Sequence, residues 1–150
     1  MRIIGGNRRG LRLAEVGEGD AAAHLRPTSD RVRESIFNLL INAHGNPVTD
    51  ARVLDLFAGT GALGLEALSR GAAEVTFVDD GAKAATLIRA NIAKMKAEGE
   101  TRILRQDATR IGPTPARPSL WSFLIHPMAS PLVKPRFRLH KRAAGSPLAQ

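Results

Sequence analysis

The chain has 150 residues, of which 43% are hydrophobic, and this is enough to build the core of one modest domain. It contains no cysteine, which excludes disulfides and cysteine-based metal sites, and no apolar run approaches the roughly 20 residues that span a bilayer. The first six residues, MRIIGG, lack the apolar core of a signal peptide. We therefore expect a cytoplasmic protein with no membrane contact.

The formal net charge of +8 is unevenly distributed. Residues 1–107 hold 15 Lys and Arg residues and all 14 Asp and Glu residues, whereas residues 108–150 hold seven basic residues and no acidic one. Seven of the nine prolines also lie in residues 108–150. A basic tail could bind nucleic acid, but this composition has low specificity for that role.

Residues 1–13 predict a short β-hairpin. Ile3-Ile4 and Leu11 to Leu13 could form its two strands, with turns at the intervening glycines. Four arginines occur here without an acid, and they are Arg2, Arg8, Arg9 and Arg12. A phosphate-contacting patch and a solvated basic surface are about equally supported by this pattern.

A helix is predicted over about residues 30–43, after a loop over residues 14–25. Thr28-Ser29-Asp30 supplies N-cap chemistry, and Gly45-Asn46-Pro47 ends the helix. Apolar residues at helical spacing predict its buried face, and they are Val32, Ile36, Leu39, Leu40 and Ala43.

An alternation of strands and helices follows. We expect strands at residues 52–57, 74–79 and 101–105, and helices at residues 62–70 and 82–97. This order implies a parallel sheet with right-handed crossovers. The pattern ends near residue 112, where a cluster of Gly and Pro begins. We therefore divide the chain into an N-terminal hairpin and helix (1–45), an α/β core (46–112) and an irregular, Pro-rich basic tail (113–150).

The most informative motif is the glycine turn DLFAGTGALG, from Asp55 to Gly64. It follows a strand and opens a helix, and Asp79 ends the next strand 20 residues after Gly59. An acid at that distance can bind both hydroxyls of a ribose, so the unit predicts a site for an adenosine-type cofactor. The alternative is a tight turn that needs glycine only for its backbone.

Charge favours one cofactor over another. A dinucleotide would bring its pyrophosphate to the turn, where Asp55 would repel it. S-adenosylmethionine instead presents a cationic amino group, which suits Asp55, and a carboxylate, which suits the amides around Gly59 to Gly61. A structural carboxylate that caps the turn is the alternative for Asp55. Asp107, after the third strand, could accept a hydrogen bond from the adenine amino group, or it could be an ordinary loop acid.

These segments together resemble a known family. MRIIGG with Arg9-Gly10, the run from Arg26 to Glu34 (RPTSDRVRE), and Val53 to Gly71 (VLDLFAGTGALGLEALSRG) look like the RsmD-type 16S ribosomal RNA (guanine-N2) methyltransferases, over residues 1 to about 110. The resemblance implies an incomplete class I S-adenosylmethionine-dependent methyltransferase fold, preceded by an N-terminal β-hairpin and helix. It also implies transfer of a methyl group to the N2 amine of a guanine in 16S rRNA.

The resemblance also implies site residues. The cofactor-binding positions are Asp55, Phe57, Ala58, Gly59, Thr60, Gly61, Ala62, Asp79, Asp107 and Ala108. The positions facing RNA are Arg2, Arg8, Arg9, Arg12, Arg26, Thr28, Arg31 and Arg33. We expect a monomer whose partner is 16S rRNA or the small ribosomal subunit, and we assign no metal and no catalytic residue.

One family element is missing. Family members carry Asp or Asn, two prolines and an aromatic residue after the fourth strand, where the polar groups accept the protons of the amine and the ring stacks on the extruded base. The corresponding stretch reads Leu124-Ile125-His126-Pro127-Met128, and the chain has no Tyr. The family activity is therefore expected to be weak or absent, and the alternative function is a non-catalytic RNA- or cofactor-binding fragment.

A frameshift near residues 111–120 would explain the missing element. Codons that the genetic code permits for Trp121 to Ala129 encode Val-Phe-Leu-Asp-Pro-Pro-Tyr-Gly when read from the third base. The same offset lets Lys141 to Pro147 encode Ala-Gly-Gly-Trp-Leu-Ala, which is also family-like. We hypothesise that the tail is translated out of frame, which would account for its lack of acids and periodicity.

Overall fold

The computed structural model describes residues 1–15, 28–43, 45–110 and 122–125. Its helices and strands in chain order are α1 (Asp30–Ala43), β1 (Arg52–Leu56), α2 (Ala62–Ser69), β2 (Glu74–Val78), α3 (Ala82–Met95), the 3-10 helix η2 (Glu98–Glu100), β3 (Thr101–Leu104), the 3-10 helix η3 (Ala108–Arg110) and β4 (Ser122–Ile125). The helices and strands predicted over residues 30–105 are confirmed, and their observed ends differ from the predicted ones by at most two residues.

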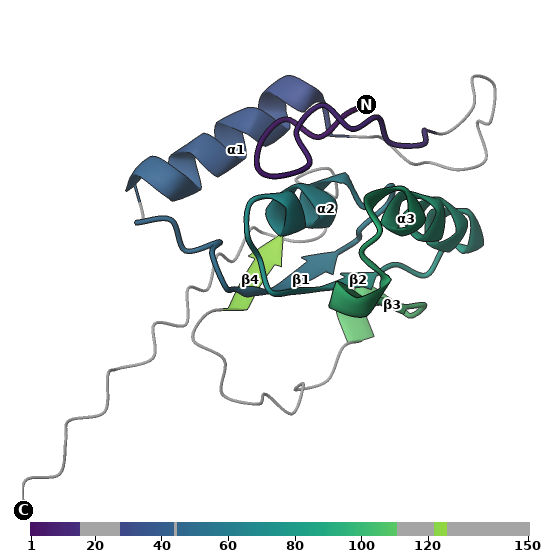
Figure 1. Ribbon diagram of the computed structural model, residues 1–150. Helices are drawn as coiled ribbons and strands as arrows, with labels where there is room; N and C mark the ends of the chain where they lie inside the picture. The colour runs from purple at the N-terminus through teal and green to yellow at the C-terminus, as the bar shows by residue number, and fades with distance from the viewer. Residues whose placement is uncertain (16–27, 44, 111–121, 126–150) are drawn as a thin grey trace, which may run out of the picture.

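The four strands form one parallel sheet in the order β3-β2-β1-β4. Parallel neighbours need long crossover connections, which α2 and α3 supply between β1, β2 and β3. Figure 1 shows α1, α2 and α3 together on one face of this sheet. The predicted parallel α/β sheet is therefore confirmed, and the carboxyl ends of its strands share one edge.

Residues 122–125 form β4 beside β1, within the tail that was expected to be irregular and whose fourth strand was doubtful. The segment reads Ser-Phe-Leu-Ile, and bulky apolar residues favour an extended strand where a neighbouring strand edge is free. Periodicity alone could not show this, because a segment of four residues is too short. Residues 111–121 and 126–150 lie outside the described residues.

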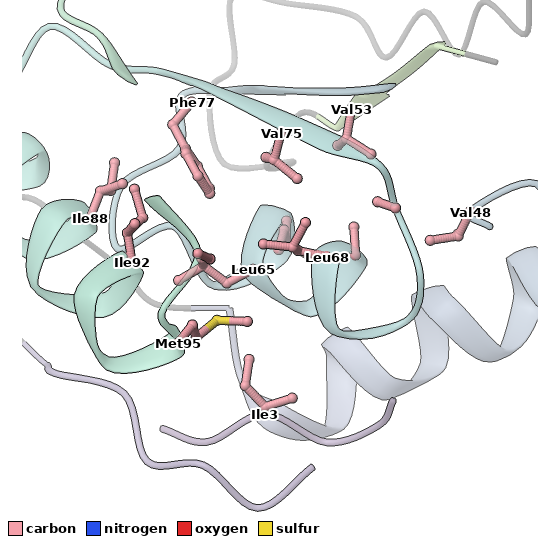
Figure 2. Packing of buried hydrophobic residues seen from close by; sticks show 14 of the residues in the cluster. Ile3, Val48, Val53, Leu65, Leu68, Val75, Phe77, Ile88, Ile92 and Met95 are labelled. Atoms are coloured by element: carbon pink, nitrogen blue, oxygen red, sulfur yellow. The ribbon is translucent and has the colours of Figure 1, made fainter. Parts of the chain in front are cut away.

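The core lies between the sheet and its helices. Along β1 and β2 alternate residues are buried, as expected for strands with one face against helices. Figure 2 shows the side chains that meet there, namely Val53, Val75 and Phe77 from the sheet, Leu65 and Leu68 from α2, and Ile88, Ile92 and Met95 from α3. Ile3 is 1% exposed and belongs to the same cluster, so the N-terminal segment is part of the fold.

The N-terminal hairpin forms with a single β-bridge, between Arg2 and Arg12. Ile3 N–H donates to Leu11 O at 2.9 Å, which continues the antiparallel pairing toward the turn. Gly6 in that turn has a φ of 79°, and a Cβ there would lie 1.8 Å from the carbonyl oxygen of Ser69. The turn therefore needs glycine in order to dock against the end of α2.

The buried face of α1 differs from the one that its apolar residues predicted. Arg33 and Phe37 are each 0% exposed, whereas Val32 and Leu39 are 50% and 62% exposed. The helix is turned so that Arg33 can reach buried partners, and Arg70, the residue that caps the C-terminal end of α2, lies 5.0 Å over the Phe37 ring. Among the described residues no helix has the length and apolarity to cross a membrane.

Candidate cofactor-binding site and RNA-facing surface

The loop between β1 and α2 turns through three residues of positive φ, which are Phe57 (55°), Gly59 (58°) and Gly61 (79°). A side-chain-bearing residue such as Phe57 is strained in this conformation, and strain of this kind gathers at functional sites. Ala58 N–H donates to Val78 O at 3.0 Å, which holds the loop against the end of β2. The loop and the start of α2 thus stand at the carboxyl edge of the sheet, where a helix N-terminus suits an anionic group.

Asp55 lies beneath this loop and is only 1% exposed. Gly64 N–H, in the first turn of α2, donates to Asp55 Oδ2 at 3.0 Å, so this carboxylate does cap the turn. A Cβ at Gly64 would lie 3.0 Å from the same oxygen and 2.4 Å from the Phe77 ring, so only glycine permits this close packing. The described residues provide no partner for Oδ1 of Asp55.

Burial, with a smaller contribution from the nearby Asp79 carboxylate, raises the pKa of Asp55 to about 8, although the hydrogen bond from Gly64 opposes the rise. A cation that reached Oδ1 would reverse the effect of burial, because it would favour the ionised form. The site therefore combines a structural bond at one oxygen of Asp55 with an acceptor at the other that no described residue occupies.

Asp79 joins two turns at the carboxyl edge. Gly59 N–H donates to its Oδ2 and Gly81 N–H to its Oδ1, each at 2.9 Å. The two hydrogen bonds occupy two of about four lone-pair sites of the carboxylate, and the residue is only partly buried. Asp79 can therefore hold the glycine loop in place and still accept hydrogen bonds from the hydroxyls of a sugar.

Asp107 and Ala108 follow β3 at the same edge. Asp79 N–H donates to Leu104 O at 3.2 Å, which ties the ends of β2 and β3 together. Asp107 Oδ1 accepts hydrogen bonds from the hydroxyl of Thr109 at 2.7 Å and from its backbone N–H at 2.8 Å. These two bonds, the hydroxyl's first, hold the pKa of Asp107 below its usual value. Asp107 thus has a local structural role, and contact with adenine remains a prediction.

Asn91 of α3 is a site residue that no motif indicated. It is 0% exposed, and its Nδ2 donates to Thr60 O in the glycine loop at 3.2 Å and to Ala14 O at 3.3 Å. Its Oδ1 accepts from Ala14 N–H at 2.6 Å. The available signal was a polar residue between Ile88 and Met95 on the apolar face of a helix. Asn91 connects the glycine loop to the end of the hairpin.

Replacing Asn91 with Leu should loosen this connection. The substitution keeps the shape but leaves Thr60 O and both backbone groups of Ala14 without their partner, which costs about 1–3 kcal/mol. We expect the affinity for S-adenosylhomocysteine to fall about tenfold, measured by calorimetry, because the loop loses a fixed position. The control is Thr86→Val on the exposed side of α3, which removes a side-chain hydrogen bond to Ala82 O. It should change neither the stability nor the affinity for S-adenosylhomocysteine. Equal cofactor affinity in the Asn91 variant and the wild type would contradict this role.

Most of the arginines predicted to face RNA do lie on the surface. The Arg2 side chain is 66% exposed, and Arg9, Arg12 and Arg31 are also exposed. Arg8 is 23% exposed, and its Nε donates to Met95 O at 3.0 Å, so it mainly fastens the hairpin to the end of α3.

Thr28 and Arg33 have structural contacts, and Arg26 lies outside the described residues. Arg33 is 0% exposed, which corrects the expectation that it faces RNA. Its Nε lies 3.2 Å from Glu66 Oε2, and its NH1 donates to Thr28 O at 3.2 Å. The guanidinium also donates to Asp30 Oδ1 at 2.9 Å and to Arg2 O. A motif rich in Arg does not reveal which guanidinium is enclosed by other segments of the chain.

The part of the chain that the structure describes holds no cluster of three or more His, Asp or Glu residues that could bind a metal ion. The chemistry of the site therefore rests, within these residues, on two carboxylates, a strained glycine loop and the start of a helix.

Comparison with known proteins agrees with this architecture. The model of the family described as "Conserved hypothetical protein 95" matches residues 1–120. Ribosomal RNA small subunit methyltransferase D of Escherichia coli K12 is 47% identical over 109 residues, which are 72% of this chain and 50% of that protein. The protein of the same name from Haemophilus influenzae is 41% identical over 101 residues, 67% of this chain and 48% of that one. The chain thus spans about half the length of these curated relatives.

A solved structure gives the same result. The yhhF protein of Escherichia coli superimposes with a TM-score of 0.58 at 40% identity, covering 72% of this chain and 53% of that one. The chain belongs to the family described as conserved hypothetical protein 95, the RsmD-type family predicted from its motifs, and has an incomplete class I methyltransferase fold.

Proposed function

We propose that the loop between β1 and α2 binds S-adenosylmethionine. The observation that carries the proposal is the buried Asp55, whose Oδ1 has no hydrogen-bond donor among the described residues and whose raised pKa a cationic amino group would lower. The amides of the loop and the start of α2 suit the carboxylate of the same ligand. Asp79 suits its ribose, because two lone pairs of that carboxylate remain available. When bound, the ligand supplies an electrophilic methyl group on a sulfonium.

The same geometry disfavours a dinucleotide. Asp55 and Asp79 place two carboxylates beside the one loop that a pyrophosphate would need to occupy. The repulsion between these two carboxylates and a bound anion exceeds the attraction that the loop amides supply. An NAD-dependent dehydrogenase is therefore the less supported alternative.

The proposed substrate is small-subunit ribosomal RNA, and the proposed target atom is the N2 amine of a guanine. The relatives named ribosomal RNA small subunit methyltransferase D support the RNA class, and the family resemblance supports the atom. Arg2 and Arg12 form the bridge at the open end of the hairpin, where they can contact phosphates near the cofactor loop. We propose a cytoplasmic location for this activity, because small ribosomal subunits are found there.

Methyl transfer by this chain is proposed to be weak or absent. Residues that follow β4 in the sequence begin His126-Pro127-Met128 and provide neither the acid nor the aromatic ring of the family motif. The second candidate function is therefore a fragment that binds cofactor and RNA without catalysis. Reading the nucleotides of codons 121–129 tests the frameshift: if no frame yields Asp-Pro-Pro-Tyr, that explanation is wrong.

The binding proposal is tested by calorimetry and the transfer proposal by labelled cofactor. We expect S-adenosylmethionine and S-adenosylhomocysteine both to bind, and NAD to bind at least about 100-fold more weakly. With 30S subunits that lack the modification, we expect RNA binding but little methyl incorporation. NAD binding as tight as that of S-adenosylmethionine would overturn the cofactor assignment, and full incorporation would overturn the fragment assignment.

A further inference from the structure

A basic pocket lies where the hairpin turn meets the last turn of α3. Its volume is about 320 Å³, and its lining residues are Arg8, Arg9, Leu11, Lys94, Met95 and Lys96. Four of these six side chains are cationic, and they come from two segments more than 80 residues apart in the sequence. The fold therefore gathers charges that the sequence does not show as a cluster.

One of the four cations is already engaged. Arg8 donates to Met95 O at 3.0 Å and lies 3.7 Å from Glu100, so it offsets the negative end of the α3 dipole. Arg9, Lys94 and Lys96 are exposed, and no carboxylate of the described residues lies within ion-pair distance of them. The other acid of η2, Glu98, is also exposed. Three cations without an ion-pair partner among the described residues thus line the pocket together with the apolar side chains of Leu11 and Met95.

Lys96 occupies a backbone position that favours another residue. As the C-cap of α3 it has φ 53° and ψ 48°, the left-handed conformation that helix ends usually give to glycine. A lysine there costs on the order of 1 kcal/mol relative to glycine. Backbone preference therefore does not explain the lysine, whereas a use for its charge would.

We propose that this pocket binds the phosphodiester backbone of the RNA substrate. The cationic side chains of the pocket suit contacts with phosphates. Such contacts position an RNA and do not read its bases. The apolar side chains suit a sugar or base edge beside the phosphate. The proposal rests on the proposed function, because it assumes that the partner is RNA.

The position of the pocket fits an RNA segment that runs along the hairpin. The open end of the hairpin lies by the cofactor loop, since the Thr60 hydroxyl approaches Met1 Sδ at 3.8 Å. The turn of the hairpin lies at the C-terminal end of α3, where Arg8 contacts Met95, about one helical turn beyond the Asn91 that holds Ala14 at the open end. Arg2 and Arg12 at the open end and the pocket at the turn would therefore contact neighbouring parts of the same backbone.

The test is the double variant Lys94→Ala and Lys96→Gly. Alanine suits a helix and glycine suits the left-handed position, so neither change should lower the melting temperature. We expect the dissociation constant for 16S rRNA and for 30S subunits, from filter binding between 50 and 200 mM salt, to rise about tenfold. The slope of log affinity against log salt should become shallower by about 1.5, because two phosphate contacts are lost. The matched control is Arg89→Ala with Arg102→Ala, which removes two exposed charges elsewhere.

The outcomes separate this site from the proposed function. A wild-type chain that binds RNA, with a double variant that matches the control in affinity and slope, overturns the pocket and leaves the proposed function standing. A folded wild-type chain that binds neither RNA sample overturns both. A double variant that loses binding to 30S subunits but not to naked 16S rRNA shows that the pocket meets a ribosomal protein, which also overturns the proposal.

Discussion

Replacing Glu66 with alanine is expected to lower the free energy of unfolding by about 3–5 kcal/mol. Glu66 is 0% exposed and lies 3.2 Å from Arg33 and 2.9 Å from Arg70. It also accepts backbone hydrogen bonds from Ile4 at 3.0 Å and from Gly5 at 2.9 Å. Without this carboxylate, the fully buried Arg33 guanidinium loses its buried counter-charge and the hairpin loses its anchor on α2.

Urea denaturation followed by circular dichroism measures this effect. Glu66→Gln keeps an acceptor oxygen, so we expect it to cost less than alanine. Glu74→Ala is the matched control, because Glu74 lies 3.5 Å from both Arg52 and Arg102 in a partly exposed row. Such surface pairs contribute about 0–1 kcal/mol. If the Glu66 and Glu74 variants lost the same stability, Glu66 would not be the centre of the N-terminal half of the fold.

The sequence predicted those parts of the fold that depend on local periodicity. The strands at residues 52–56 and 74–78 are buried runs bounded by turns, and the helices between them follow the 3.6-residue repeat. The glycine turn was predictable as well, because Gly61 and Gly64 are needed for a positive φ and a close approach. Such features are encoded within a few residues of where they act.

Features that depend on distant contacts were not predictable. Val32 and Leu39 read as core residues because only apolarity was counted, yet the helix turns Arg33 toward Glu66, 33 residues away. The link from Asn91 to Thr60 spans 31 residues and its link to Ala14 spans 77. One buried ion pair or amide can outweigh an apolar stripe, because leaving such a group unpaired costs several kcal/mol.

Below pH 7.5, the affinity for S-adenosylhomocysteine is expected to increase about tenfold for each unit by which the pH rises. The Asp55→Asn variant should not show this pH dependence. The pKa of Asp55 is about 8 in the unliganded fold, because burial and then Asp79 favour its neutral form. Binding of the ligand's ammonium group requires the ionised form, so the fraction of competent protein rises with pH. Above about pH 8 most of Asp55 is already ionised in the unliganded fold, so the rise should level off there. Calorimetry at several pH values measures the slope.

At pH 7.5 the same variant should bind the ligand about 10- to 100-fold more weakly. An asparagine offers an oxygen to Gly64 N–H as before, but it provides no charge for the ammonium group, and a charge-assisted bond contributes about 1.5–3 kcal/mol. Ala62→Ser, at the first residue of α2, keeps the carboxylate and should retain the pH slope. An unchanged slope in Asp55→Asn would show that the carboxylate is only a cap for the turn.

Stability should respond to the same substitution in the opposite direction. The pKa of Asp55 is raised in the folded state, so the fold holds a proton that the unfolded chain loses above about pH 4. The wild-type contribution therefore falls as pH rises from about 4 to 8. Asp55→Asn does not titrate, so at pH 8 it should exceed the wild type in free energy of unfolding by on the order of 2 kcal/mol, and the difference should vanish near pH 4.

A variant that binds ligand more weakly yet unfolds less readily indicates a carboxylate kept for its ligand at a cost to the fold. The raised pKa, on which both predictions depend, would be contradicted if the free energy of unfolding of Asp55→Asn relative to that of the wild type were lower at pH 8 than at pH 4.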